Sequence, residues 1–278
     1  MRAPEHECSP RTTSRAKGYS LPLAYGMAKA AELAYQNEDA VKAEAGRWGF
    51  DRVRHHLTRF TPPFPLADTQ AYTAASDNMI IIAFRGTEPA QIRDWLSDVN
   101  TPPRPGPAGT GLVHFGFAEA LRSVWPQVKD AVSELRDNDQ SVWFTGHSLG
   151  GALAMLAGAW LSFEDPKLRA DGVYTFGQPR TCDRLLASAY NTAFAGRCHR
   201  FVNNNDIVPR LPPEPVYHHV DALRFIDAAG RVRESTTLLG GLTERAKGLT
   251  ADAFAPASAG IRDHFMAAYR TAIEKNLT

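Results

Sequence analysis

An apolar run, a serine between glycines and a helix of small residues follow one another in the middle of the chain. The motif G-H-S-L-G occupies residues 146–150, between the apolar run Val142–Thr145 and the mostly small and apolar stretch Leu149–Phe163. A serine on a sharp turn from a strand into a helix has strained backbone angles, and glycines two residues before and after it remove Cβ atoms that would clash there. The strand and the helix therefore predict that Ser148 is a nucleophile, in preference to a glycine-rich tight turn.

Apolar runs alternate with amphipathic stretches over most of the chain. The runs predict strands, and apolar side chains at helical spacing predict helices. The predicted strands cover residues 71–75, 79–84, 142–145, 173–176, 199–202 and 217–226, and the predicted helices cover residues 21–35, 118–136, 149–163, 183–194 and 261–274. Strands that alternate with helices indicate an α/β fold with a mostly parallel central sheet flanked by helices. We expect one domain over residues 1–278, with a flexible segment at 1–18 and a long Pro- and Gly-rich loop at 87–111.

The composition limits the classes of partner. The 31 Lys and Arg against 30 Asp and Glu leave a formal charge of +1, which argues against the broad basic face of a nucleic-acid-binding protein. No stretch approaches the roughly 20 apolar residues of a membrane span.

Residues 1–18 contain no apolar run like that of a secretory signal, so we expect a cytoplasmic protein or a mature or non-classically secreted form. Cys8, Cys182 and Cys198 form no disulfide framework and no metal-binding spacing, so we expect isolated thiols and no metal site.

Two later residues are expected to complete a catalytic triad. In folds with a serine at such a turn, the acid and then the histidine follow it in the chain. The acid should end a strand, as Asp206 does after the predicted strand at 199–202. Asp183 opens a helix as an N-cap, and Asp221 lies inside a predicted strand, so both are weaker candidates.

The histidine should lie in a loop near the C-terminus. The sequence R-D-H-F places His264 at the start of the last predicted helix, with Asp263 as the N-cap. His218 and His219 are rivals, but they lie within a predicted strand close after Asp206, where we expect a structural or solvent-facing role.

An oxyanion hole in such a site consists of two backbone N–H groups, one on the residue after the nucleophile and one on a loop after an early strand. Leu149 supplies the first. Thr87 is the candidate for the second, because the buried run at 79–84 ends in Arg-Gly-Thr. An ordinary turn residue is the alternative interpretation of Thr87. The apolar side chains that follow have the spacing of an amphipathic helix: Ile92, Trp95, Leu96 and Val99.

Seven segments resemble, in the same order, the class 3 lipases, which are the fungal-type triacylglycerol lipase family. The segments are F-R-G-T at 84–87, D-W-L-S-D at 94–98, V-H-F-G-F at 113–117, G-H-S-L-G-G at 146–151, Y-T-F-G-Q-P-R at 174–180, V-N-N-N-D-I-V-P-R-L-P-P at 202–213 and D-H at 263–264. The resemblance implies an α/β-hydrolase core that hydrolyses carboxylic esters. It implies that Ser148 is the nucleophile, that Asp206 and His264 are its partners, and that Thr87 and Leu149 form the oxyanion hole.

The resemblance also implies a lid after the oxyanion threonine. The residues that match the lid are Ile92, Trp95 and Leu96, with Trp95 at the centre. Asp98 matches a residue that supports the oxyanion residue in the family. A packed helix of the core is the alternative interpretation of this segment, because it would show the same periodicity.

The expected function is that of a carboxylic ester hydrolase, a triacylglycerol lipase or esterase that works through a Ser-His-Asp acyl-enzyme. The expected substrate is an acyl ester at a lipid–water interface, and the mechanism requires no cofactor. An esterase for polar esters, such as feruloyl or acetyl groups, is the alternative on the same core. A non-catalytic binding protein on a hydrolase fold is a further alternative, against which the presence of all three triad residues argues. Nothing beyond the shared triad favours a serine peptidase.

Overall fold

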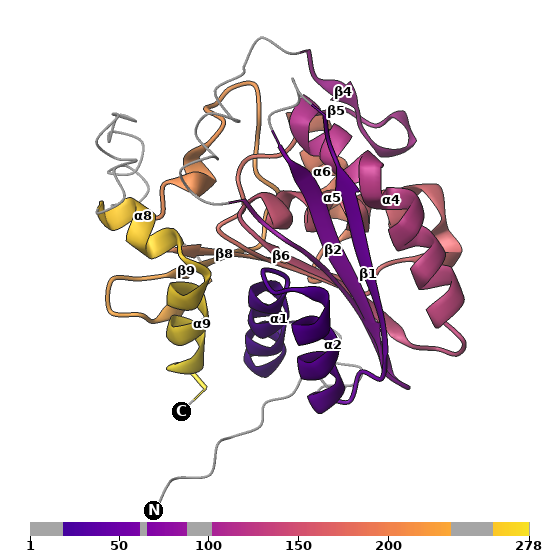
Figure 1. The fold of residues 1–278 in the computed structure, drawn as a ribbon. Coiled ribbons are helices and arrows are strands. Elements are labelled where there is room, and N and C mark those ends of the chain that lie inside the picture. The colour runs from indigo at the N-terminus through magenta and orange to yellow at the C-terminus, as the bar shows by residue number, and fades with distance from the viewer. Residues whose placement is uncertain (1–18, 62–65, 88–101, 235–257, 278) are drawn as a thin grey trace, which may run out of the picture.

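The computed structural model in Figure 1 describes residues 19–61, 66–87, 102–234 and 258–277. The predicted flexible segment at 1–18 lies outside the described residues. So do the expected lid residues Ile92, Trp95 and Leu96, together with Asp98.

An eight-stranded sheet forms the centre of the molecule, with the strand order β1-β2-β3-β6-β7-β8-β9-β10. Its strands are β1 (Arg52–Arg59), β2 (Asp68–Ala75), β3 (Met79–Phe84), β6 (Ser141–His147), β7 (Gly172–Phe176), β8 (Cys198–Asn203), β9 (Leu223–Ile226) and β10 (Val232–Arg233). Neighbouring strands from β3 to β9 run parallel, while β1, β2 and β10 pair antiparallel at the two edges. The short strands β4 (Arg104–Pro105) and β5 (Leu112–Val113) form a separate antiparallel pair. The mostly parallel sheet predicted from the sequence is confirmed.

Helices cover both faces of the sheet (Figure 1). The α-helices are α1 (Leu21–Leu33), α2 (Glu38–Arg47), α4 (Phe115–Leu135), α5 (Leu149–Glu164), α6 (Arg184–Ala193), α8 (Ala259–His264) and α9 (Met266–Glu274), and the 3-10 turns are η2 (Pro107–Gly109), η3 (Pro166–Leu168) and η4 (Val208–Arg210). The helices α1 and α9 pack on one face, and α4, α5 and α6 pack on the other. The central strands are therefore buried on both sides.

Strand β3 shows how the sequence produces these two layers. Successive side chains of a strand point to opposite faces. Ile80 and Ile82 pack with α4 and α5, whereas Met79 and Ile81 pack with α1 on the other face. Because both faces are covered, the strand is a continuous apolar run and shows no alternation of polar and apolar residues.

Strand β1 was not predicted from the sequence, and the predicted strand at 217–226 is wrong over most of its length. Strand β1 has the polar sequence R-V-R-H-H-L-T-R and pairs only with β2, so most of its side chains are partly or fully exposed and no apolar run marks it. In the second segment only Leu223–Ile226 is a strand, as β9. Tyr217 and Val220 are buried there by loop packing, and their spacing of three residues is not that of one face of a strand.

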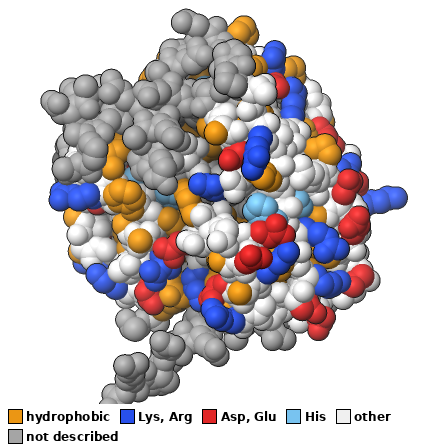
Figure 2. Space-filling view, viewed as in Figure 1, with side chains coloured by type: hydrophobic (Ala, Val, Ile, Leu, Met, Phe, Trp, Pro, Cys, Tyr) orange, Lys and Arg blue, Asp and Glu red, His pale blue; other side chains and the backbone are white. Residues whose placement is uncertain are grey.

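The predicted helix at 261–274 is also wrong in one respect, because it is two helices. Phe265 has extended backbone angles, φ −58° and ψ 136°, and separates α8 from α9. None of the helices in the described part of the chain combines the length and apolar character needed to cross a membrane. Acidic and basic side chains are interspersed on the face shown in Figure 2.

Candidate active site

Ser148 lies on the turn between β6 and α5 with a strained backbone. Its angles are φ 59° and ψ −127°, a combination that residues with a side chain rarely adopt. A Cβ on Gly146 would collide with the carbonyl oxygen of Gly150, and a Cβ on Gly150 would collide with that of Phe84. The two glycines of the motif are therefore required by the close packing of this turn, as the sequence predicts.

Ser148 lies at the N-terminal end of α5. Ser148 occupies the N-cap position of α5, so the backbone N–H of Leu149 is among the first-turn amides that have no partner within the helix. Ser148 is completely buried, and its Oγ has no hydrogen-bond partner among the described residues. A buried hydroxyl without a partner is unusual in a folded protein and marks a place where chemistry is to be expected.

Asp206 and His264 form a buried pair. The Nδ1 atom of His264 lies 2.9 Å from both carboxylate oxygens of Asp206, and both side chains are completely buried. Asp206 follows the carboxyl end of β8, and its carboxylate also accepts a hydrogen bond from the backbone N–H of Val208 at 2.9 Å. The other ring nitrogen of His264, Nε2, has no hydrogen-bond partner in the described part of the chain. The pair can therefore hold the imidazole in one orientation and leave Nε2 available to accept a proton.

Tyr269 on α9 is a further partner of this carboxylate, which the sequence analysis did not identify. Its hydroxyl donates to Oδ2 of Asp206 and accepts from the backbone N–H of Asn203 at 3.0 Å. Burial and the negative charge of Asp206 raise the pKa of Tyr269 well above its ordinary value, so the phenol keeps its proton and remains a donor. The periodic apolar pattern of α9 gave no signal for this role, because Tyr269 also fits a core position.

The residues Asn203–Asn205, at the end of β8, form hydrogen bonds with Asp263, the residue before His264. The side chain of Asn203 donates to the backbone carbonyl of Asp263 at 2.9 Å, and the side chain of Asn204 donates to the Asp263 carboxylate at 3.0 Å. The backbone N–H of Asn205 donates to the same carboxylate at 3.1 Å. These three bonds fix the chain at Asp263 and so bring His264 to Asp206.

The predicted local structure around His264 is therefore wrong. Asp263 is not an N-cap, because its carboxylate is used by the asparagine run. The N-cap of α8 is Ser258, whose side chain accepts from the N–H of Ile261, and His264 is the last residue of α8 and not the first of a helix.

Gly177, which follows β7, borders the pair closely. Its backbone has φ +60°, and an added Cβ would lie 2.9 Å from Oδ2 of Asp206 and 2.9 Å from Cε1 of His264. In the sequence, Gly177 stands out only as part of the segment at 174–180. The structure shows that this position excludes a side chain because the Asp206–His264 pair occupies the space.

The rival residues lie elsewhere. His218 and His219 are not in a strand, contrary to the prediction. His219 is bonded through Nε2 to the carbonyl oxygen of Pro209 at 2.6 Å, and burial lowers its pKa well below the ordinary value. Asp183 caps α6 by accepting from the N–H of Leu186 at 2.9 Å, as expected from the sequence. The backbone N–H of Asp221 is bonded to the side chain of Asn191.

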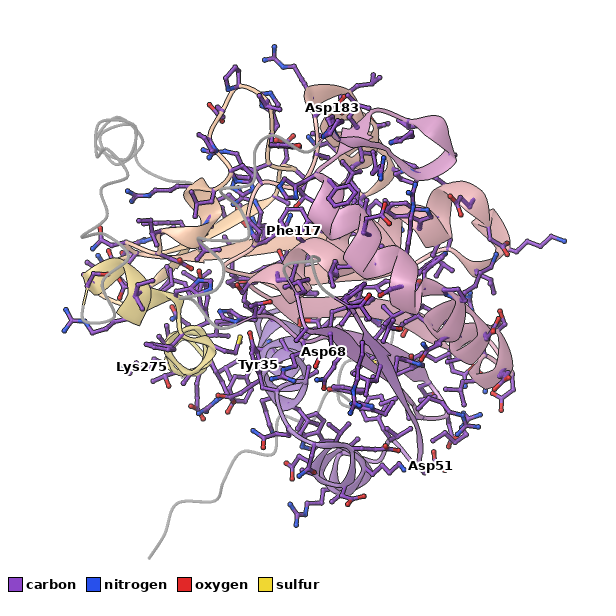
Figure 3. The ribbon with its side chains drawn as sticks, turned by 45° about the horizontal axis from the view of Figure 1, so that its top comes forward. Tyr35, Asp51, Asp68, Phe117, Asp183 and Lys275 are labelled. Carbon is purple, nitrogen blue, oxygen red and sulfur yellow. The ribbon has the colours of Figure 1, made fainter. Side chains whose placement is uncertain are left out.

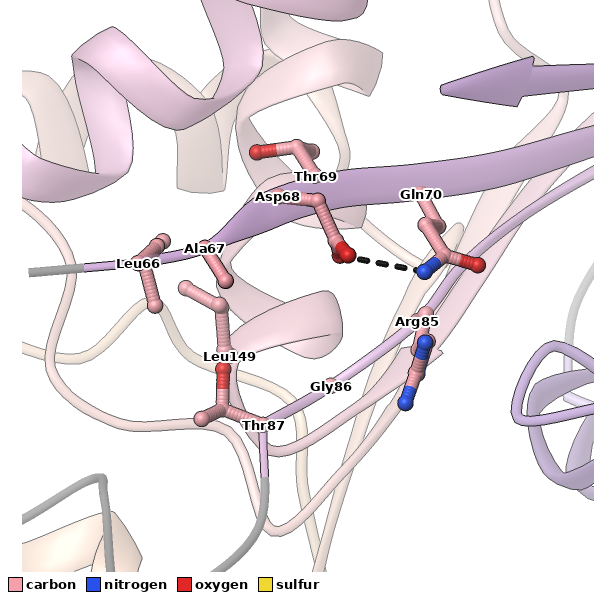
Figure 4. A pocket seen from close by; sticks show the side chains of 9 residues that line it. All are labelled: Leu66, Ala67, Asp68, Thr69, Gln70, Arg85, Gly86, Thr87 and Leu149. Atoms are coloured by element: carbon pink, nitrogen blue, oxygen red, sulfur yellow. Dashed lines mark hydrogen bonds between the residues drawn. The ribbon is translucent and has the colours of Figure 1, made fainter. Parts of the chain in front are cut away.

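Thr87 and Leu149, the expected oxyanion residues, line one cavity of about 230 Å³ (Figure 4). Its lining residues are Leu66, Ala67, Asp68, Thr69, Gln70, Arg85, Gly86, Thr87 and Leu149. A Cβ on Gly86 would lie 3.2 Å from Cβ of Ser148, so the segment that leads to Thr87 passes directly beside Ser148. The structure thus brings the early loop and the Ser148 turn together, as an oxyanion hole requires.

Comparison with known proteins agrees with this geometry. A family model described as "Lipase (class 3)" matches residues 81–216. Over these 136 of its 278 residues the chain resembles the class 3 lipases. The matched range of this family includes Thr87, Ser148 and Asp206, while His264 lies beyond it and is placed by the geometry. The family resemblance noted from the sequence motifs is confirmed.

Individual lipases resemble the chain over different lengths. Triacylglycerol lipase OBL1 of Arabidopsis thaliana is 30% identical over 72% of this chain and 48% of the relative. Secreted mono- and diacylglycerol lipase 1 of Fusarium solani is 37% identical over 55% of this chain and 46% of the relative. The chain thus spans about half the length of these curated relatives.

Solved structures of lipases share the fold. The mono- and diacylglycerol lipase from Aspergillus oryzae superposes with a TM-score of 0.67 and 21% identity, over 91% of this chain and 99% of that structure. The Rhizomucor miehei lipase propeptide complex gives a TM-score of 0.58 and 25% identity, over 87% of this chain and 78% of that structure. The α/β-hydrolase fold expected from the sequence is confirmed.

Proposed function

We propose that the chain is a serine hydrolase of carboxylic esters and acts as a lipase. One observation carries the proposal: the buried Asp206–His264 pair leaves Nε2 of His264 without a partner in a molecule whose strained Ser148 also has a buried, unpartnered Oγ. A histidine held by a carboxylate at Nδ1 can take the proton of a serine through its other ring nitrogen. The resemblance of residues 81–216 to the class 3 lipases supports the same reaction.

The residues have distinct roles in the proposed reaction. Oγ of Ser148 attacks the ester carbonyl carbon while Nε2 of His264 takes its proton. Asp206 keeps the remaining ring proton on Nδ1 and stabilises the imidazolium. The backbone N–H groups of Thr87 and Leu149 stabilise the oxyanion that forms on the carbonyl oxygen.

The second half of the reaction uses the same groups. The imidazolium of His264 gives its proton to the leaving alcohol, which breaks the ester bond and leaves the acyl group on Ser148. His264 then takes a proton from water, whose oxygen attacks the acyl carbon and releases the carboxylic acid.

Apolar acyl esters at a lipid–water interface are the proposed substrates. The support is the resemblance of residues 81–216 to the class 3 lipases and the apolar periodicity that includes Ile92, Trp95 and Leu96. We propose that these residues form a lid, whose apolar side is stabilised by contact with lipid and penalised in water, and that Asp98 supports the oxyanion residue.

An esterase for polar esters, such as feruloyl or acetyl groups, is the second candidate. One observation favours it: the cavity beside Thr87 has a polar part formed by Asp68, Gln70 and Arg85, with Asp68 accepting from Gln70 at 3.1 Å (Figure 4). Polar groups that line a binding site select polar substrates.

Initial rates on p-nitrophenyl esters from acetate to palmitate, with and without detergent micelles, distinguish the two candidates. A lipase should prefer the long esters and gain activity with micelles, whereas an esterase for polar groups should prefer acetate and feruloyl esters in solution.

Trp95→Ala should lower the rate of hydrolysis of emulsified long-chain esters several-fold and change the rate on short soluble esters little. Equal loss on both substrates, with a large fall in Tm, would show a core tryptophan and no lid, since deleting a core tryptophan costs about 3–5 kcal/mol.

A further inference from the structure

His147, the residue before the nucleophile, connects two distant parts of the chain. Its Nδ1 atom lies 2.8 Å from the hydroxyl of Tyr35, and its Nε2 atom lies 2.6 Å from the backbone carbonyl oxygen of His264. The rings of His147 and His264 also pack against each other, with centroids 4.5 Å apart. Tyr35 follows the C-terminus of α1 and is labelled in Figure 3.

The direction of these two hydrogen bonds follows from the chemistry of the partners. A carbonyl oxygen only accepts, so Nε2 of His147 must carry a hydrogen. Burial, together with the neighbouring His264, lowers the pKa of His147 well below its ordinary value, so the ring is neutral and Nδ1 is an acceptor. The hydroxyl of Tyr35 therefore donates to Nδ1 of His147, and His147 donates to His264.

The carbonyl oxygen of His264 needs such a donor. His264 is the last residue of α8, and Phe265 breaks the helix with an extended conformation. Carbonyl groups at the C-terminal end of a helix have no partner within the helix. The His147 ring supplies a donor to this one, so His264 is held at its side chain by Asp206 and at its backbone by His147.

The glycine of the Arg-Gly-Thr segment provides independent support. A Cβ on Gly86 would collide with the hydroxyl oxygen of Tyr35 and would also lie 2.5 Å from the carbonyl oxygen of His147. Tyr35 and His147 also line a cavity of about 180 Å³ together with Thr87 and Phe265. The phenol is thus packed directly against the segment that leads to the oxyanion residue.

We propose that Tyr35 and His147 are positioning residues that fix the backbone of His264, and with it the direction of Nε2 toward Ser148. The inference rests on the proposed function, since it concerns the histidine of that reaction. It assigns a role in the site to the residue that follows the N-terminal helix, at a sequence distance of 112 residues from His147.

The test is Tyr35→Phe, which removes one hydroxyl and keeps the ring. We expect kcat on p-nitrophenyl butyrate to fall about three- to tenfold, the kinetic equivalent of one neutral hydrogen bond, with KM unchanged. The rate at which a soluble p-nitrophenyl phosphonate inactivates the enzyme by reaction with Ser148 should fall by the same factor. Tyr25→Phe is the matched control, because Tyr25 is on α1 and its hydroxyl bonds Glu274 at 2.8 Å; its kcat should stay at the wild-type value.

His147 is tested by two substitutions. A glutamine can place an N–H donor near the position of Nε2, whereas a methionine cannot donate. We expect His147→Gln to retain more of the wild-type kcat than His147→Met. If His147→Met does not fold, Tyr35→Phe and His147→Gln still test the proposal. A wild-type kcat in Tyr35→Phe overturns it.

Two other outcomes would also overturn it. A folded Tyr35→Phe that raises KM and keeps kcat would show that Tyr35 contacts substrate. Equal losses in His147→Gln and a folded His147→Met would show that the donor to His264 is not what matters. A wild-type protein without esterase activity would refute the proposed function and this inference with it, whereas an active wild type with an unaffected Tyr35→Phe refutes the inference alone.

Discussion

Replacing Gly177 with alanine tests how closely the Asp206–His264 pair is packed. The new Cβ would lie 2.9 Å from Oδ2 of Asp206, 2.9 Å from Cε1 of His264 and 3.0 Å from its Nδ1. Carbon contacts are favourable at about 3.5–4.0 Å, so the histidine ring must move by roughly 0.5 Å or more. Since a displacement of about 1 Å in an active site can lower the rate about 100-fold, we expect kcat to fall roughly 10- to 100-fold.

Gly196→Ala is the matched control for this substitution. Gly196 has φ +72°, close to the +60° of Gly177, but a Cβ there would meet nothing within 4 Å. Both variants should lose about 1–2 kcal/mol of unfolding free energy, because an alanine at positive φ is strained. Gly177→Ala should lose somewhat more than Gly196→Ala because of the clash.

Urea unfolding measures the free energy, and initial rates on p-nitrophenyl butyrate measure kcat. Only Gly177→Ala should lose activity. A folded Gly177→Ala with wild-type kcat, or equal losses of kcat in the two variants, would refute the reasoning.

Two further predictions concern histidines. His264→Ala should lower kcat about 10⁴- to 10⁶-fold, while His218→Ala should stay near the wild-type rate; a dead His218→Ala would show that the wrong histidine was chosen. Burial, with a smaller contribution from Arg224, lowers the pKa of His199 from 6.5 to about 4, so the unfolded chain binds a proton between these values and the folded one does not. The part of the unfolding free energy that depends on His199 is therefore greatest above pH 6.5 and falls as the pH falls toward 4. Between pH 7 and pH 5 this decrease is about 2 kcal/mol. Urea unfolding at these two pH values should show that His199→Gln loses about 2 kcal/mol less than the wild type, and an identical loss would contradict the assignment.

The sequence predicts the sharp turn at Ser148 well because the residues that determine it lie close together in the chain. The strain at Ser148, the two glycines and the apolar strand and helix all lie within a short stretch. The continuous apolar run of β3 likewise marks a strand buried on both faces. Where short-range sterics and burial decide the structure, the pattern of residues is sufficient to identify it.

The surroundings of His264 were harder to predict because distant contacts decide them. The apolar side chains from Ile261 to Ile273 fit one helix, yet the chain breaks at Phe265. The break is accompanied by bonds from the asparagine run to Asp263 and from His147 to the carbonyl of His264. Such bonds join segments far apart in sequence, so no local pattern reveals them.

The partners Tyr35 and Tyr269 show the same limit. Each looks like an ordinary aromatic residue at the end of, or within, an apolar helix, and only the fold brings its hydroxyl to His147 or to Asp206. Strand β1 escaped notice for a different reason, because an edge strand that is half exposed needs no apolar run.

The central claim is that Ser148 carries the acyl group during hydrolysis. The most direct measurement mixes the enzyme with a p-nitrophenyl ester, quenches in acid within the first turnover, and locates the bound acyl group by mass spectrometry of the peptides. The account predicts a burst of p-nitrophenolate with the acyl group on Ser148, and neither burst nor label in a folded Ser148→Ala. An acyl group on another residue, or a folded Ser148→Ala that keeps more than about one per cent of the wild-type rate, would contradict it.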